Sequence, residues 1–188
     1  MGTRAGRPHD ERVESDVLEL TQLQAGLDEI RRAPTTEGTV ALIVRRPVQD
    51  EREVLSEAEL NTELGVVGDD WFKRDGDPRS QITLMNVRAI ALIAQSEDRW
   101  PLAGDQLYVD LDLSDANVPP GTRIAVGSAI VEASEVPHRG CKKFGARFGL
   151  DALRFVNSTI GYELNLRGIN ARIVQGGVVR PGDPVRKL

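Results

Sequence analysis

The chain has 188 residues and a formal net charge of -5, and 40% of its residues are hydrophobic, which is enough for the core of one domain. The acidic balance argues against the basic face that a nucleic-acid or membrane-surface protein needs, so neither partner is expected. A single cysteine excludes an internal disulfide and suits a reducing compartment, so the cytoplasm is the expected location.

The first predicted element is a helix over residues 16–33, which follows a tail over residues 1–15. The tail is charged, contains Gly and Pro, and is expected to be flexible. Beyond it, apolar residues recur at the three- and four-residue spacings of a helix: Val17, Leu20, Leu23, Leu27 and Ile30. Asp16 is the expected N-cap. We expect residues 16–188 to form a single domain with this helix packed outside it.

Most of the remaining chain has the pattern of short strands separated by glycine and proline turns. In residues 107–113 apolar residues alternate with Tyr108, Asp110 and Asp112, which predicts a strand with one face buried and the other exposed to solvent. Gly127-Ser128 suits a two-residue hairpin loop. The other predicted strands are residues 39–46, 81–85, 122–126, 129–133, 169–174, 178–180 and 185–187. This pattern predicts a mainly β fold, a closed or nearly closed barrel with peripheral helices.

Two further helical regions are predicted between the strands. Asn86 is the expected N-cap of a helix whose apolar residues lie on one face of residues 87–94. A helical insertion is expected over residues 142–166, with Asp151 as the cap of one of its segments.

The most informative stretch runs from Pro137 to Gly149. It holds Cys141, the one cysteine, and His138, one of two histidines. Four basic residues and no acidic residue lie between His138 and Arg147, namely Arg139, Lys142, Lys143 and Arg147. A thiol among such cations is favoured as the thiolate, the form that attacks sulfur or binds metal.

Each of these residues also has a plainer interpretation. A lone cysteine is usually a small buried apolar residue. His138 can orient or deprotonate the thiol, or it can cap a turn after Pro137. The basic residues can bind an anion or lie on a solvated face. Arg167 and Arg172 can bind a cofactor phosphate or pair with carboxylates. Gly68-Asp69-Asp70 is interpreted as a structural loop.

Six segments follow one another along residues 38–188 in an order known from one protein family: Gly65–Trp71, Gln81–Met85, Gly104–Leu107, Pro120–Gly127, Arg167–Val174 and Gly177–Asp183. They resemble segments of the MOSC domain, the module at the end of molybdenum cofactor sulfurases that also occurs as small bacterial proteins. The stretch Pro137-His138-Arg139-Gly140-Cys141 is closer to the short stand-alone type than to the commoner pattern with Pro beside Cys. The resemblance implies a barrel-like β fold and sulfur or molybdenum chemistry, with the cysteine as the reactive group.

The resemblance leaves two main functions open. In the first, Cys141 carries a persulfide sulfur that a pyridoxal-phosphate-dependent cysteine desulfurase supplies, so pyridoxal phosphate belongs to the partner. In the second, Cys141 ligates the molybdenum of a bound molybdopterin, and the protein reduces N-hydroxylated compounds with electrons from a donor protein. A binding domain without chemistry is a third possibility.

The candidate catalytic residues are therefore Cys141 and His138. The candidate cofactor-binding residues are Arg139, Lys142, Arg147, Arg154, Arg167 and Arg172. We expect at least two of the last four arginines to converge near Cys141 as an anion pocket. Convergence would favour the molybdenum enzyme, whereas arginines that are scattered and paired with carboxylates would favour the carrier.

Overall fold

The computed structural model describes residues 17–74 and 76–188, so the predicted tail and the Asp16 cap lie outside the described residues. A closed seven-stranded barrel forms the centre of the molecule, which confirms the predicted fold class. All neighbouring barrel strands are antiparallel except β5 and β6. Around the barrel the order is β1 (Glu37–Arg45), β11 (Pro184–Lys187), β7 (Arg123–Val126), β8 (Ala129–Ala133), β9 (Ile169–Gln175), β5 (Ile82–Asn86) and β6 (Leu107–Val109), which pairs again with β1.

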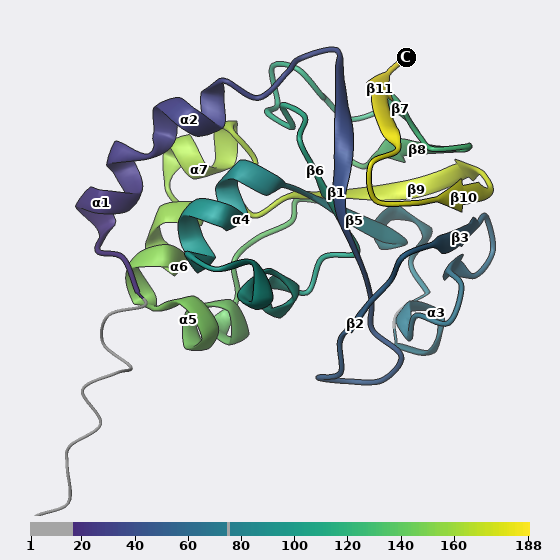
Figure 1. The fold of residues 1–188 in the computed structure, drawn as a ribbon, viewed down its shortest axis with the longest axis horizontal. Coiled ribbons are helices and arrows are strands. Elements are labelled where there is room, and N and C mark those ends of the chain that lie inside the picture. The colour runs from purple at the N-terminus through teal and green to yellow at the C-terminus, as the bar shows by residue number, and fades with distance from the viewer. Residues whose placement is uncertain (1–16, 75) are drawn as a thin grey trace, which may run out of the picture.

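The barrel is covered on one side by helices, as Figure 1 shows. They create a second apolar core outside the barrel, in addition to the core that its inward-facing Val, Leu, Ile and Ala side chains form. No helix in residues 17–74 or 76–188 has the length and apolar character needed to cross a membrane. The helices are α1 (Leu20–Ala25), α2 (Leu27–Arg31), α4 (Val87–Ala94), α5 (Lys142–Phe148), α6 (Leu150–Val156) and α7 (Thr159–Glu163).

A smaller sheet lies beside the barrel. It consists of β10 (Gly177–Val179), β3 (Ala58–Asn61) and β4 (Gly65–Val66). The short helix α3 (Trp71–Arg74) comes directly after β4 along the chain. The two-residue strand β2 (Glu53–Val54) pairs with the end of β1. The small sheet was not predicted, because two of its strands lie in a charged region with weak alternation.

The predicted helix over residues 16–33 is instead two short helices, α1 and α2. They meet at Gly26, where an added Cβ would lie 2.6 Å from the Leu92 side chain. The N-cap is Glu19, which forms a reciprocal capping box with Gln22. The apolar spacing thus identified the buried side, with Leu23 and Ile30 in the core, and missed the interruption.

Two side-chain predictions were wrong. Tyr108 does not face water: it is fully buried, and its hydroxyl donates to the Trp100 carbonyl at 2.7 Å, because helices cover the outer face of β6. Asp151 does not cap α6, whose N-cap is Gly149. The Asp151 carboxylate instead accepts the Leu20 N–H at 3.1 Å and so joins α6 to the start of α1.

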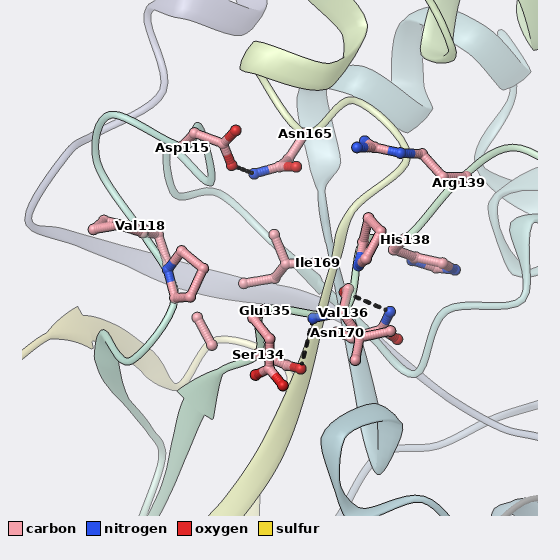
Figure 2. Close-up of a pocket in the computed structure, with 14 residues that line it drawn as sticks. Asp115, Val118, Ser134, Glu135, Val136, His138, Arg139, Asn165, Ile169 and Asn170 are labelled. Carbon is pink, nitrogen blue, oxygen red and sulfur yellow. Dashed lines mark hydrogen bonds between the residues drawn. The ribbon is translucent and has the colours of Figure 1, made fainter.

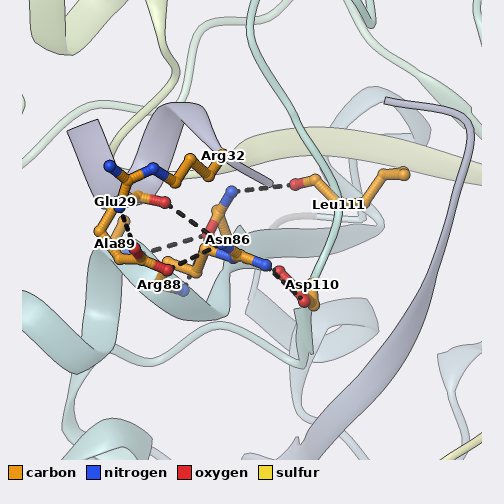
Figure 3. A network of polar contacts seen from close by, with 7 residues as sticks. All are labelled: Glu29, Arg32, Asn86, Arg88, Ala89, Asp110 and Leu111. Carbon is orange, nitrogen blue, oxygen red and sulfur yellow. Dashed lines mark hydrogen bonds and ion pairs between the residues drawn. The ribbon is translucent and has the colours of Figure 1, made fainter. Parts of the chain in front are cut away.

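The predicted cap of α4 is confirmed, and it also ties the helix to the barrel (Figure 3). The Asn86 side-chain oxygen accepts the N–H groups of Arg88 and Ala89 at 2.8 and 3.4 Å. Its amide nitrogen donates to the Leu111 carbonyl at 3.0 Å. One buried side chain therefore provides hydrogen-bond partners for backbone N–H groups at the start of α4 and for a backbone carbonyl in the extended chain after β6.

We expect Asn86→Ala to lower the free energy of unfolding by about 1–2 kcal/mol, because it removes a helix cap and leaves buried backbone groups unpaired. Urea denaturation would measure the loss. Asn61→Ala is the matched control, since Asn61 accepts two backbone N–H groups in the exposed β3–β4 turn. An equal loss in both variants would contradict the structural role assigned to Asn86.

Candidate functional site

Cys141 lies at the point where the chain enters the helical layer. The loop from Ser134 to Gly140 leaves β8, and Cys141 is the N-cap residue of α5. The cysteine is exposed, while Phe144 and Phe148 on the same helix are buried. The apolar face of α5 therefore fixes the helix to the molecule and leaves the thiol at the surface.

A buried polar centre lies behind this loop. Arg167, in the turn before β9, donates to the Asp105 carboxylate at 2.5 Å and to the Ala103 carbonyl at 2.9 Å. The Asp105 side chain is fully buried, and the Nδ1 atom of His138 lies 3.4 Å from its second oxygen. The Arg167 guanidinium also lies 5.1 Å from the centre of the Phe144 ring. The centre thus joins the Cys141 loop, α5 and the segment before β6.

His138 is neutral in this environment at neutral pH. Burial first, and then the positive charge of Arg167, lower the pKa of His138 to about 3, although the Asp105 carboxylate acts in the opposite direction. Its side chain keeps 18% of its surface exposed. A histidine with so low a pKa is a weak base at neutral pH. This environment favours an orienting role in the loop over deprotonation of the thiol.

We expect the stability of the protein to fall on acidification because of His138. Unfolded histidine binds a proton below about pH 6.5, whereas folded His138 stays neutral until much lower pH. The unfolded state thus gains protons first, and about 2 kcal/mol of unfolding free energy should be lost between pH 7.5 and 5. Urea denaturation at several pH values should show this loss, and His138→Gln should flatten the profile. A variant as pH-dependent as the wild type would contradict the assignment.

The basic residues near Cys141 are mostly paired. Lys143 and Arg147 both contact Asp50, at 3.0 and 3.2 Å. The Arg139 guanidinium lies 3.7 Å from the centre of the Tyr162 ring. Lys142 is exposed on the first turn of α5. The segment around Cys141 contains no acidic residue, but part of its positive charge is neutralised by Asp50, which lies more than ninety residues away along the chain.

The four arginines expected to converge pair with four different carboxylates. Arg147 contacts Asp50, Arg154 contacts Asp151, Arg167 contacts Asp105 and Arg172 contacts Glu132. Arg154 and Arg172 are more than half exposed, on α6 and β9. They do not form a common anion pocket with the other two. Only Arg167 directly adjoins the buried centre that includes His138.

Among the cavities near this region, two adjoin the residues discussed above. The larger, of about 340 Å³, lies beside the Cys141 loop and is lined by His138, Arg139, Asn165 and Asn170 among others (Figure 2). The smaller, of about 110 Å³, includes Lys143 of α5 in its wall. The remaining residues around the smaller cavity are Arg46, Val48, Gln49, Asp50, Arg52 and Asp70.

Arg52 is the distinctive residue of the smaller cavity. Among the described residues no carboxylate contacts its guanidinium, and its Nε atom is buried without a hydrogen-bond partner. Burial first, and then the charges of Arg147 and Arg46, lower the pKa of Arg52. Arg46 itself is held by Asp69 through contacts of 3.0 Å. The Asp50 carboxylate in the same cavity wall acts in the opposite direction, so it offsets part of the Arg52 charge without a direct contact.

No role was assigned from the sequence to Asp105, to Arg52 or to Asn157, whose side chain hydrogen-bonds both backbone groups of Gly140. Asp105 lies in one of the segments that resemble the MOSC domain, and that position is the sequence signal that points to it. Arg52 lies in an ordinary charged run, and Asn157 follows a short helix, so neither has a recognisable local pattern.

Within residues 17–74 and 76–188, no group of three or more His, Cys, Asp and Glu side chains is arranged to hold a metal ion.

Solved structures of low sequence identity share the fold. YuaD from Bacillus subtilis aligns with a TM-score of 0.60 at 16% identity, covering 79% of this chain and 94% of that one. YiiM from Escherichia coli aligns with a TM-score of 0.55 at 18% identity, covering 80% and 69%. YiiM from Geobacillus stearothermophilus gives 0.52 at 15% identity, covering 80% and 73%.

Sequence comparison with curated proteins gives no significant match. The MOSC domain family, in contrast, matches residues 72–186, which is more than half of the chain. This match spans the barrel from β5 to β11 and includes Cys141. The chain belongs to the MOSC domain family.

Proposed function

We propose that this protein is a persulfide sulfur carrier in molybdenum cofactor chemistry, with Cys141 as the sulfur acceptor. The supporting observation is an exposed thiol on a fixed helix start, beside arginines that are already paired with carboxylates. Sulfur transfer needs an accessible thiolate and a docking surface, and it needs no pocket for a cofactor phosphate.

The transfer step exchanges one sulfur–sulfur bond for another. The Cys141 thiolate attacks the outer sulfur of a persulfide on the donor protein. The bond between the two donor sulfurs breaks, its electron pair stays on the donor as a thiolate, and a new sulfur–sulfur bond forms on Cys141. No external oxidant or reductant is required. A pyridoxal-phosphate-dependent cysteine desulfurase is the class of enzyme that supplies such a donor.

The test is to incubate the protein with a cysteine desulfurase and cysteine and to measure its intact mass. We expect a gain of one sulfur atom, located on the peptide that contains Cys141 and removed by a thiol reductant. A protein that gains no sulfur under conditions where a known carrier is loaded would overturn the carrier function.

A second function, a molybdenum-cofactor-dependent reductase of N-hydroxylated compounds, is favoured by the cavity at Arg52. The Arg52 guanidinium has a buried, unpartnered Nε atom and is the type of group that binds a phosphate such as the one molybdopterin carries, although Asp50 and Asp70 also line this cavity. Arg52 and Lys143 would hold the phosphate, and the Cys141 thiolate is the type of soft ligand that suits the metal. When bound, the cofactor would supply two-electron redox chemistry, with electrons from a separate donor protein.

Metal and pterin content separates the two functions. Protein purified from a host that makes the cofactor should contain neither molybdenum nor pterin if it acts only as a carrier. For a reductase, both should be present and both should be lost in Arg52→Ala. Arg154→Ala is the matched control, because Arg154 is an exposed arginine paired with Asp151, away from the cavity.

A further inference from the structure

A single side chain holds both backbone groups of the residue before Cys141. The Gly140 N–H donates to the Asn157 side-chain oxygen at 2.9 Å. The Asn157 amide nitrogen donates to the Gly140 carbonyl at 3.0 Å. Asn157 thus supplies the two hydrogen bonds that a neighbouring strand would otherwise provide, at the C-terminal end of α6.

Gly140 is also packed tightly against the same end of α6. A Cβ atom at this position would lie 2.7 Å from Val156 Cγ2 and 2.9 Å from Leu153 Cδ1. α6 is itself anchored, because its Phe155 and Val156 are buried in the helical core. The backbone that leads into Cys141 therefore rests on a rigid support, while the thiol remains exposed.

We propose that Asn157 is a positioning residue for Cys141, which fixes the backbone so that the thiol meets a protein-borne persulfide in one orientation. The inference rests on the proposed function of Cys141 as a sulfur acceptor. A sulfur held in the active site of another protein can be attacked only along a restricted direction. A small reagent, in contrast, reaches an exposed thiol from any open side. Asn157 should thus matter for protein-to-protein transfer and not for intrinsic accessibility.

The experiment compares two rates on the full chain, namely sulfur loading from a cysteine desulfurase and alkylation by iodoacetamide. Asn157→Ala should slow loading by about 10- to 100-fold, the size of effect that a misplaced reacting group produces. Its alkylation rate should stay close to that of the wild type. Asn157→Asp keeps an acceptor for the Gly140 N–H and should recover part of the loading rate; it also replaces the alanine variant if that one does not fold.

Asn170→Ala is the matched control. Asn170 donates to the Val136 carbonyl at 3.1 Å, in the same loop but five residues before Cys141. We expect its loading rate to remain near that of the wild type. Equal slowing in both variants, or slowing of loading and alkylation together, would overturn the positioning role.

The outcome also separates this inference from the proposed function. If the wild type loads sulfur on Cys141 and Asn157→Ala loads it equally fast, only the positioning role is wrong. If the wild type acquires no sulfur on Cys141, the carrier function fails and the positioning role falls with it.

Discussion

Cys141→Ser should reduce sulfur loading from a desulfurase to background. A serine hydroxyl is not ionised at neutral pH and cannot form the sulfur–sulfur bond that holds the transferred atom. Because the chain has only one cysteine, no other thiol can substitute for it. Intact mass before and after treatment with a thiol reductant measures the effect directly.

The same variant should fold normally. Cys141 is exposed, and substitutions at exposed sites usually change the unfolding free energy by less than about 0.5 kcal/mol. Urea denaturation of Cys141→Ser therefore serves as the control for its loss of loading. A serine variant that still gains a reducible sulfur would rule out Cys141 as the acceptor. If the variant also left molybdenum and pterin content unchanged in material that contains them, a binding domain without chemistry would become the better description.

The barrel was predictable because its strands are short, alternate in polarity and are separated by turn residues. β8 and β9 illustrate this, since their predicted bounds, 129–133 and 169–174, agree with the observed strands to within one residue. The prediction that Tyr108 faces solvent was wrong, because the alternation of apolar and polar residues describes one strand alone. It cannot show that a separate layer of helices covers the other side of that strand.

For the candidate site, the sequence indicated only contacts between residues that are close along the chain. Cys141 and His138 share one loop, and their proximity to basic residues was visible from the sequence. The contacts that decide their environment come from distant segments: Asp105 lies beside His138, and Asp50 pairs with Lys143. Such pairs form only when the barrel closes and α5 packs on it, so no local pattern indicates them.

The buried pair of Arg167 and Asp105 should have a large effect on stability. Arg167→Met should lower the free energy of unfolding by about 3–5 kcal/mol, the usual result of removing one partner of a buried ion pair. The loss arises because the Asp105 carboxylate would remain fully buried without its counter-charge, and the Ala103 carbonyl would lose its donor. Urea denaturation of the wild type and the variant at neutral pH would measure it.

Two further variants make this expectation specific. Arg154→Ala removes an arginine from a pair that is largely exposed, and it should change stability by less than about 1 kcal/mol. The double variant Asp105→Leu with Arg167→Met removes both charges together, so it should recover much of the stability lost in Arg167→Met alone. A double variant that is less stable than Arg167→Met would mean that Asp105 contributes through other contacts, and His138, 3.4 Å from its carboxylate, is the first to consider. Recovery of stability would instead identify the unpaired buried carboxylate as the source of the loss.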